Sequence, residues 1–215
     1  ILTDIRDNNT YTVAKLADGK CWMTQNLRIT GDSIKAGLNK TITEYDSNVS
    51  VNFTVPSSEA WTDTSVTGNH VYYGNKVLYG AYYTWYTATA GTEGIGYDVC
   101  PKEWRLPVGG AEGDLKLLAD KGTVKVGTWE SNSETFGYWL GVEAENEVGG
   151  AFFPAAGYFK ANDGALKSVG LSGNYWTSTL NGSRVYNLYF NNTMIDAESG
   201  EQYRYGGYTI RCVVK

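Results

Sequence analysis

Apolar and polar residues alternate in several short stretches of this chain, and such alternation is typical of half-buried β-strands. A β-prone run at residues 10–15 is followed by the turn pair Asp18-Gly19 and by a second run that extends toward Ile29. An Asp-Gly pair between two such runs predicts a hairpin over residues 10–29. Further strands are predicted at residues 71–73, 174–179, 184–191 and 207–214.

The strand predicted at residues 184–191 divides its side chains into two sets, because successive residues of a strand point to opposite faces. One set is apolar or aromatic and the other is rich in amides: Tyr186, Leu188 and Phe190 against Asn187, Tyr189 and Asn191. In the last predicted strand the same alternation directs Cys212 inward.

Two segments have the spacing of helices instead. Residues 80–90 carry an apolar stripe that stops before Gly91, and residues 111–121 carry a stronger stripe that stops before Gly122. Strands, then two helices, then strands again predict an α+β fold. The 215 residues fit a single domain over 1–215, in which residues 31–78 form a loop-rich insertion without sustained periodicity.

Composition indicates the kind of fold and limits the classes of binding partner. Gly 26, Tyr 17 and Trp 7 against Pro 4 indicate a turn-rich fold with an aromatic core. The net charge is -5, and the 18 basic residues are scattered, which argues against nucleic acid as a partner. No apolar run is long enough to insert into a membrane. The chain begins at Ile1 without a signal peptide, so we expect a mature fragment.

The three cysteines, Cys21, Cys100 and Cys212, form no CxxC pair, and His70 is the single histidine, so a zinc site is not expected. They indicate one disulfide and one buried thiol. A bridge between Cys100 and Cys212 would close a long loop and stabilise the fold by roughly 4–5 kcal/mol. We expect this pair, and with it an oxidising compartment such as the cell surface.

Five segments of the chain resemble the Fibrobacter succinogenes major paralogous (FISUMP) domain. The first two are Gly19-Lys20-Cys21-Trp22-Met23-Thr24-Gln25-Asn26-Leu27 and Cys100-Pro101-Lys102-Glu103-Trp104-Arg105-Leu106-Pro107, where Glu103 stands at a position that is usually Gly. The others are Pro154-Ala155-Ala156-Gly157-Tyr158, Tyr175-Trp176-Thr177-Ser178-Thr179 and Ile210-Arg211-Cys212-Val213. In order, they cover nearly the whole chain outside residues 31–78.

The resemblance implies a C-type-lectin-like α+β fold with two helices, mixed antiparallel strands and much irregular loop, on an extracellular bacterial protein. Related proteins are variable proteins of diversity-generating retroelements, whose C-terminal segment is diversified and displayed as a binding face. Residues 180–206 look like such a segment. Trp22, Trp104 and Trp176 are expected in the core, and Arg105 and Arg211 are expected to pair with carboxylates or carbonyls.

Tyrosines, asparagines and serines over residues 180–206 predict a binding surface, because this mixture resembles a paratope. The candidate ligand-binding residues are Asn181, Ser183, Arg184, Asn187, Tyr189, Asn191, Asn192, Tyr203 and Tyr205. We expect an adhesin-like ligand-binding domain at the bacterial cell surface. Its expected partner is a protein or a cell-surface glycan, and the alternative for these residues is an ordinary solvated strand face.

Weaker patterns in the sequence leave other functions open. Asp196-Ala197-Glu198-Ser199-Gly200 and the acidic residues 143–147 could bind calcium in a calcium-dependent lectin, although neither completes a calcium-loop pattern and no cofactor is expected. A structural module of a larger surface protein is a further alternative. No nucleophile motif accompanies His70, so catalysis is not expected.

Overall fold

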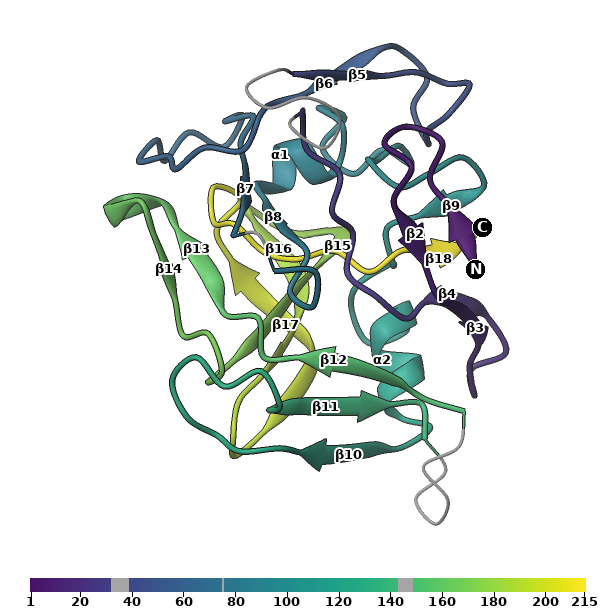
Figure 1. Cartoon of the computed structure of the whole chain (residues 1–215), viewed down its shortest axis with the longest axis vertical. Helices are drawn as coiled ribbons and strands as arrows, with labels where there is room; N and C mark the ends of the chain where they lie inside the picture. Colours follow the sequence, from purple (N-terminus) through teal and green to yellow (C-terminus); the bar gives the residue numbers. More distant parts are fainter. Residues whose placement is uncertain (32–38, 75, 143–148) are drawn as a thin grey trace.

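The computed structural model describes residues 1–31, 39–74, 76–142 and 149–215. Strands account for 37% of the described residues and helices for 7%, so this part of the chain is mostly β, with many small antiparallel sheets (Figure 1). The expected α+β, C-type-lectin-like fold is therefore wrong. The physical reason lies mainly at residues 80–90, where most of an expected helix is replaced by a strand and a single helical turn.

Three larger sheets organise the molecule. A four-stranded sheet has the order β3-β4-β18-β9, a central sheet has the order β15-β16-β17, and a third has the order β10-β11-β12. Listed in the order of these sheets, the strands are β3 (Val13–Lys15), β4 (Cys21–Met23), β18 (Val213–Val214), β9 (Trp104–Arg105), β15 (Gly173–Asn181), β16 (Arg184–Phe190), β17 (Ile195–Gln202), β10 (Thr123–Val126), β11 (Gly137–Leu140) and β12 (Ala151–Pro154).

The described residues also form four two-stranded sheets. They are β1 (Leu2–Thr3) with β2 (Thr10–Tyr11), β5 (Lys40–Ile42) with β6 (Phe53–Val55), β7 (Val71–Tyr73) with β8 (Ala81–Tyr83), and β13 (Tyr158–Lys160) with β14 (Ala165–Lys167). The strand predicted at residues 71–73 is confirmed as β7. Within the described part of residues 31–78, Trp61 is buried beside Phe159, so this segment contributes to the core.

The two α-helices of the described residues are short. The helix expected over residues 80–90 is wrong for its first half, because β8 pairs with β7, and only α1 (Trp85–Ala88) is helical. Threonine hydroxyls bond locally here: Thr84 accepts from the Thr87 N–H and Thr89 donates to the Trp85 carbonyl. The helix expected over residues 111–121 is confirmed but shorter, as α2 (Asp114–Ala119). A 3-10 turn, η2 (Ala161–Asp163), completes the helical residues described.

The N-terminal hairpin is confirmed, since β3 pairs antiparallel with β4 across a turn in which Gly19 has a φ of 82°. A positive φ is a conformation that glycine adopts without steric cost. Glu103 also has a positive φ, 68°, a conformation that favours glycine. Within residues 207–214 only Val213–Val214 form a strand, and β17 was not predicted.

The central sheet separates two hydrophobic clusters. Trp176 of β15 packs in the cluster that contains α1, whereas Leu188 of β16 packs in the cluster that contains α2. The Trp176 indole donates to the Tyr83 carbonyl at 2.7 Å, so this buried side chain also has its polar atom satisfied. The expected core positions of Trp22, Trp104 and Trp176 are confirmed.

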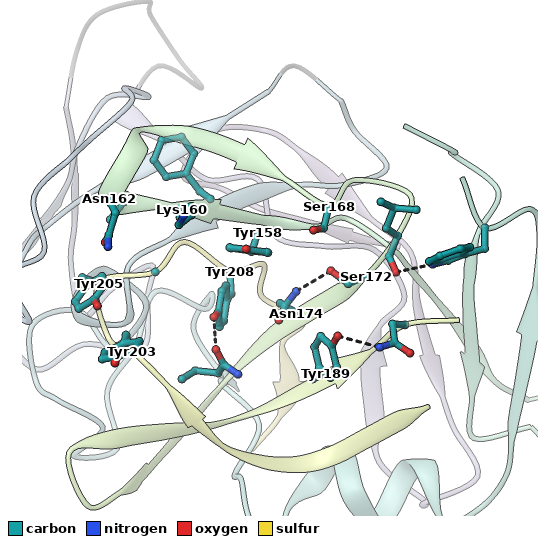
Figure 2. Close-up of a pocket in the computed structure, with 17 residues that line it drawn as sticks. Tyr158, Lys160, Asn162, Ser168, Ser172, Asn174, Tyr189, Tyr203, Tyr205 and Tyr208 are labelled. Carbon is teal, nitrogen blue, oxygen red and sulfur yellow. Dashed lines mark hydrogen bonds between the residues drawn. The ribbon is translucent and has the colours of Figure 1, made fainter. Parts of the chain in front are cut away.

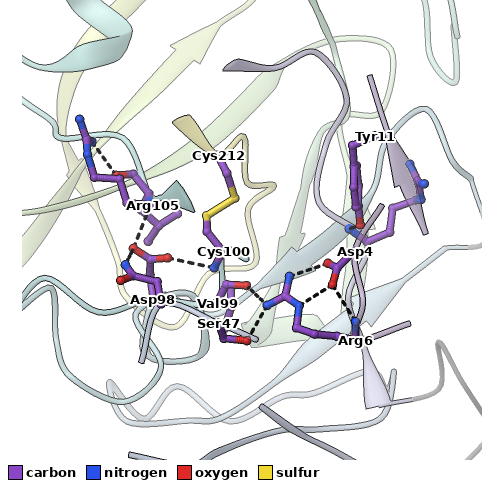
Figure 3. Close-up of a disulfide and its surroundings, with 12 residues drawn as sticks. Asp4, Arg6, Tyr11, Ser47, Asp98, Val99, Cys100, Arg105 and Cys212 are labelled. Carbon is purple, nitrogen blue, oxygen red and sulfur yellow. Dashed lines mark hydrogen bonds and ion pairs between the residues drawn. A yellow bond between two sulfur atoms is a disulfide. The ribbon is translucent and has the colours of Figure 1, made fainter. Parts of the chain in front are cut away.

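The disulfide between Cys100 and Cys212 is confirmed, with a Cα–Cα distance of 6.0 Å (Figure 3). It joins two segments 112 residues apart, next to the site where β18 pairs with both β4 and β9. Cys21 is a free thiol that is half-buried, not fully buried as expected. A bridge that closes so long a loop removes many conformations from the unfolded chain.

Buried charges surround the disulfide. The fully buried Arg6 donates to both carboxylate oxygens of Asp4, at 2.7 and 2.6 Å, and to the carbonyl of Val99, next to Cys100 (Figure 3). Asp98 accepts from the N–H of Cys100 at 2.9 Å. Burial raises the pKa of Asp98 to about 6. We call the disulfide, the Asp4–Arg6 pair and Asp98 the disulfide frame.

Both arginines of the resembled motifs are held by neighbours, as expected. Arg105 pairs with Asp114 at 2.6 Å, and Arg211 donates to Asn26 at 2.6 Å and to the carbonyl of Phe152 at 3.0 Å. Burial lowers the pKa of Arg211 to about 10. Both guanidinium groups therefore donate to acceptors of the protein itself. In the described part of the chain, no helix is long and apolar enough to cross a membrane.

Candidate functional site

A cavity of about 590 Å³ opens beside the central sheet (Figure 2). Four segments and the single residue Trp129 form its walls: residues 158–162, 168–174, 189–191 and 202–208. Most of the side chains are aromatic, amide or hydroxyl groups, namely Trp129, Tyr158, Phe159, Tyr189, Tyr203, Tyr205, Tyr208, Asn162, Asn174, Asn191, Gln202, Ser168 and Ser172. Among the described residues of the lining, Lys160 carries the one charge.

Backbone bridges between distant segments assemble this cavity. Gly157 pairs with Gly173, and Phe159 pairs with Gly207, which joins β13 to the start of β15 and to the segment that follows β17. A Cβ atom at Gly207 would lie 2.6 Å from the Cβ of Phe159 and 2.7 Å from the Trp61 ring. Only glycine permits this approach, so Gly207 sets the distance between two walls.

Tyr208 forms the back of the cavity. Its ring packs 4.2 Å from that of Trp176 and meets Tyr158 edge-on, with centroids 6.2 Å apart. Its hydroxyl donates to the side-chain oxygen of Gln202. Burial raises the pKa of Tyr208, so the phenol stays protonated at neutral pH. This wall is rigid because the ring has neighbours on two sides and its polar atom is bonded.

Tyr203 and Tyr205 form a stacked pair at the rim, with centroids 5.0 Å apart. The guanidinium of Arg184 lies 3.3 Å from the centre of the Tyr203 ring, which favours a cation–π contact. The Trp61 indole donates to the Tyr205 carbonyl at 3.2 Å. Tyr203 remains 51% exposed, so an ordered aromatic surface is available to a ligand.

Amides and hydroxyls lie to the right of the Tyr203–Tyr205 pair in Figure 2, around Ser172, Asn174 and Tyr189. The Asn174 amide donates to Ser172 Oγ at 3.4 Å, and the Asn191 amide donates to the Tyr189 hydroxyl at 3.0 Å. Ser168 contributes a hydroxyl that makes no side-chain hydrogen bond to another described residue. These groups can donate and accept hydrogen bonds at fixed positions.

The structure brings four of the nine predicted binding residues into the cavity, namely Tyr189, Asn191, Tyr203 and Tyr205. Arg184 supports Tyr203 from outside the lining.

The remaining four lie elsewhere. Asn181 and Ser183 are exposed at the β15–β16 turn, and Asn192 accepts from Lys125 at 2.9 Å through its carbonyl. Asn187 is fully buried opposite Trp176, so its expected place on an exposed face is wrong. The strand alternates as predicted, but its second face is covered by the core around Trp176 for part of its length.

Several cavity residues were missed from the sequence, chiefly Trp129, Tyr158, Lys160, Asn162, Ser168, Ser172, Asn174 and Tyr208. A weaker form of the same signal is present, because residues 158–174 also contain Tyr, Asn and Ser, although Tyr158 is the single tyrosine among them. Tyr158 and Tyr208 were read only as parts of, or neighbours to, motifs of the framework.

The calcium hypothesis gains no site from the described residues, which hold no cluster of three or more His, Cys, Asp or Glu side chains suited to a metal ion. Asp196 lies in β17 and accepts from the Glu198 N–H at 3.0 Å. The acidic residues 143–147 lie outside the described residues. His70 stacks on Trp61, with Glu59 and Asp63 at 3.7 and 3.6 Å from its two ring nitrogens.

Comparison with known proteins gives one match, and it falls on the cavity. A family model described as Domain of unknown function (DUF8237) matches residues 129–213. This range contains all the residues that line the cavity, from Trp129 to Tyr208. No curated protein and no solved structure matches the chain.

Proposed function

We propose that this protein is an extracellular ligand-binding domain and that the tyrosine-lined cavity is its binding site. The observation that carries the proposal is the ordered, partly exposed aromatic pair Tyr203–Tyr205 beside a cavity of about 590 Å³. Cavities of about 300–1,000 Å³ with aromatic walls and a few fixed polar groups are typical ligand sites. Tyrosine supplies large contact area while few torsions are frozen, and the amides supply adaptable hydrogen bonds.

The disulfide supports the extracellular part of the proposal. A bridge between segments 112 residues apart is typical of proteins in oxidising compartments. The C-terminal segment contains both Cys212 of the disulfide and Thr209, which pairs with Tyr175 of β15. We therefore expect the disulfide frame to help to hold the cavity walls in place. A preorganised site binds with a smaller loss of conformational entropy.

Alanine variants of three cavity tyrosines test the proposal. The wild-type protein is screened against arrays of glycans and of cell-surface proteins, together with Tyr189→Ala, Tyr203→Ala and Tyr205→Ala. We expect the ligand signal to fall by tenfold or more in each variant, about 1.4 kcal/mol or more, with little change in melting temperature.

Tyr45→Ala is the matched control, since Tyr45 is 82% exposed and does not line the cavity. Retained binding in all three cavity variants would locate the site elsewhere and contradict the proposal. Unfolding of these variants would instead show that the tyrosines belong to the core.

The relation to variable proteins of diversity-generating retroelements remains part of this proposal. It is supported by the four cavity residues that come from residues 180–206. The test is the gene neighbourhood: a reverse transcriptase gene and a near-identical template repeat, differing at adenines, are expected. If the template differed only at codons outside the cavity lining, the diversified surface would be a different one.

A further inference from the structure

The walls of the cavity are aromatic and polar but almost uncharged. Aromatic ring faces are combined with neutral amides and hydroxyls, and the described lining residues include no carboxylate. A sugar has the complementary surfaces, because its C–H faces pack against aromatic rings and its hydroxyls both donate and accept hydrogen bonds. The volume of about 590 Å³ accommodates a short oligosaccharide.

Other ligand classes fit these walls less well. Nucleic acid needs several cations to neutralise its phosphates, and the lining has Lys160 alone. An extended peptide is usually held through main-chain hydrogen bonds at an open strand edge. In this cavity, residues with polar or aromatic side chains such as Tyr203, Asn162 and Asn174 form the lining, and we expect recognition through those side chains.

One positive charge remains at the cavity. Lys160 and Lys167 share a single carboxylate, that of Asp163, at 3.6 and 3.2 Å respectively. Asp163 itself does not line the cavity, whereas Lys160 does, next to Asn162 (Figure 2). Because two cations face one anion, the group carries a net charge of +1 that a ligand can neutralise. The Lys160 side chain is 46% exposed, so its attraction for a bound acid group depends on the salt concentration.

We propose that the cavity binds a short oligosaccharide that carries a carboxylate, with the acid group at Lys160 and the sugar rings on the tyrosines. This inference rests on the proposed function and adds the chemical class of the ligand. The Tyr203–Tyr205 pair and the Asn174–Ser172 end supply the contacts to the neutral part of the sugar.

The experiment uses a panel of uronic-acid and sialic-acid oligosaccharides, each paired with its carboxyl-reduced counterpart. Binding of the wild-type domain is measured by calorimetry at low and at moderate salt. We expect at least one acidic sugar to bind, its reduced counterpart to bind at least tenfold more weakly, and the difference to shrink as salt rises.

Lys160→Met tests the assigned charge. It is expected to weaken binding of the acidic sugar about tenfold and to leave binding of the reduced sugar unchanged. Lys121→Met is the matched control, because Lys121 is exposed and lies outside the cavity lining. Thermal melts of both variants confirm that the fold is intact.

Three results would overturn the inference. Equal affinity for acidic and reduced sugars would show that the carboxylate does not contribute to binding. Binding of proteins but of no sugar, lost in Tyr203→Ala, would leave the proposed function standing with a different ligand class. Binding that is unaffected by any cavity variant would contradict both the inference and the proposed function.

Discussion

The disulfide frame and the cavity are both rich in polar side chains, but they use them in opposite ways. In the frame, Arg6 donates hydrogen bonds to Asp4, Ser47 and Val99, and all of these groups are buried. In the cavity, Tyr203 is half exposed, and its ring already stacks on one side. Polar groups that satisfy one another stabilise a fold, whereas ordered groups left open to solvent can bind a ligand.

The largest effect on the frame is expected from removing the disulfide. Cys100→Ser with Cys212→Ser frees a loop of 112 residues, and chain-entropy models give about 4.7 kcal/mol for a loop of this size. The free energy of unfolding is measured by urea denaturation. Cys21→Ser is the control, since this thiol is unpaired and half-buried. A loss below about 1 kcal/mol would show that the frame does not depend on the bridge.

A loss almost as large is expected from Arg6→Met, which leaves the buried Asp4 carboxylate without its partner. Breaking a buried ion pair from one side costs about 4 kcal/mol. Denaturation of Arg6→Met is compared with that of the double variant Asp4→Asn, Arg6→Met, which removes the unpaired charge. The double variant is expected to be the more stable of the two. The opposite order would mean that the pair is not the source of the effect.

The third effect is a dependence of stability on pH. The folded pKa of Asp98, about 6, lies above the reference value of 3.8. A raised carboxyl pKa stabilises the fold fully below pH 3.8, and this contribution is lost as the pH rises through 6. At 1.36 kcal/mol per pKa unit, the loss is about 3 kcal/mol.

The measurement for Asp98 is the free energy of unfolding at intervals between pH 4 and pH 7, for the wild type and for Asp98→Asn. The variant is expected to lack this part of the decline. Asp114 does not interfere in this window. Burial opposes its ionisation, but hydrogen bonds from Arg105 and Lys20 outweigh burial and lower its pKa. Its contribution is therefore lost only as the pH falls below the window. Equal slopes for wild type and variant would rule out Asp98 as the titrating group.

The smallest effect on stability is expected in the cavity, where Tyr203→Ala removes an exposed ring and its contact with Arg184. The cost is below about 1 kcal/mol, because an exposed cation–π contact contributes about 0.5–1 kcal/mol. Chemical denaturation of this variant, set beside that of Arg6→Met, compares the two regions directly. If Tyr203→Ala proved as destabilising as Arg6→Met, the difference between frame and cavity would disappear.

Local patterns predicted local structure well. The alternation around Asp18-Gly19 predicted the β3–β4 hairpin, and the apolar stripe before Gly122 predicted α2. The stripe at residues 80–90 misled, because two of its members, Ala81 and Tyr82, are buried equally well by a strand that pairs with β7. Burial alone does not distinguish a short helix from a short buried strand.

The candidate site was predicted only in part. Composition identified four residues of the cavity, Tyr189, Asn191, Tyr203 and Tyr205. It did not identify Tyr158 or the other lining residues between positions 158 and 174. Composition identifies side chains that suit binding, but it does not show which of them share a cavity. Asn187 illustrates the limit, since its place on the same strand face as Tyr189 did not reveal that Trp176 and its neighbours cover it.

The sequence by itself determined which residues are stiff, apolar or able to turn, and with them the early hairpin, the core tryptophans and the mixture of side chains suited to binding. The tertiary structure decided which distant segments meet. The bridges Gly157–Gly173 and Phe159–Gly207 join positions far apart in the chain, and they create the cavity. Such pairings depend on how whole sheets pack around the disulfide frame, and no local pattern of residues encodes that packing.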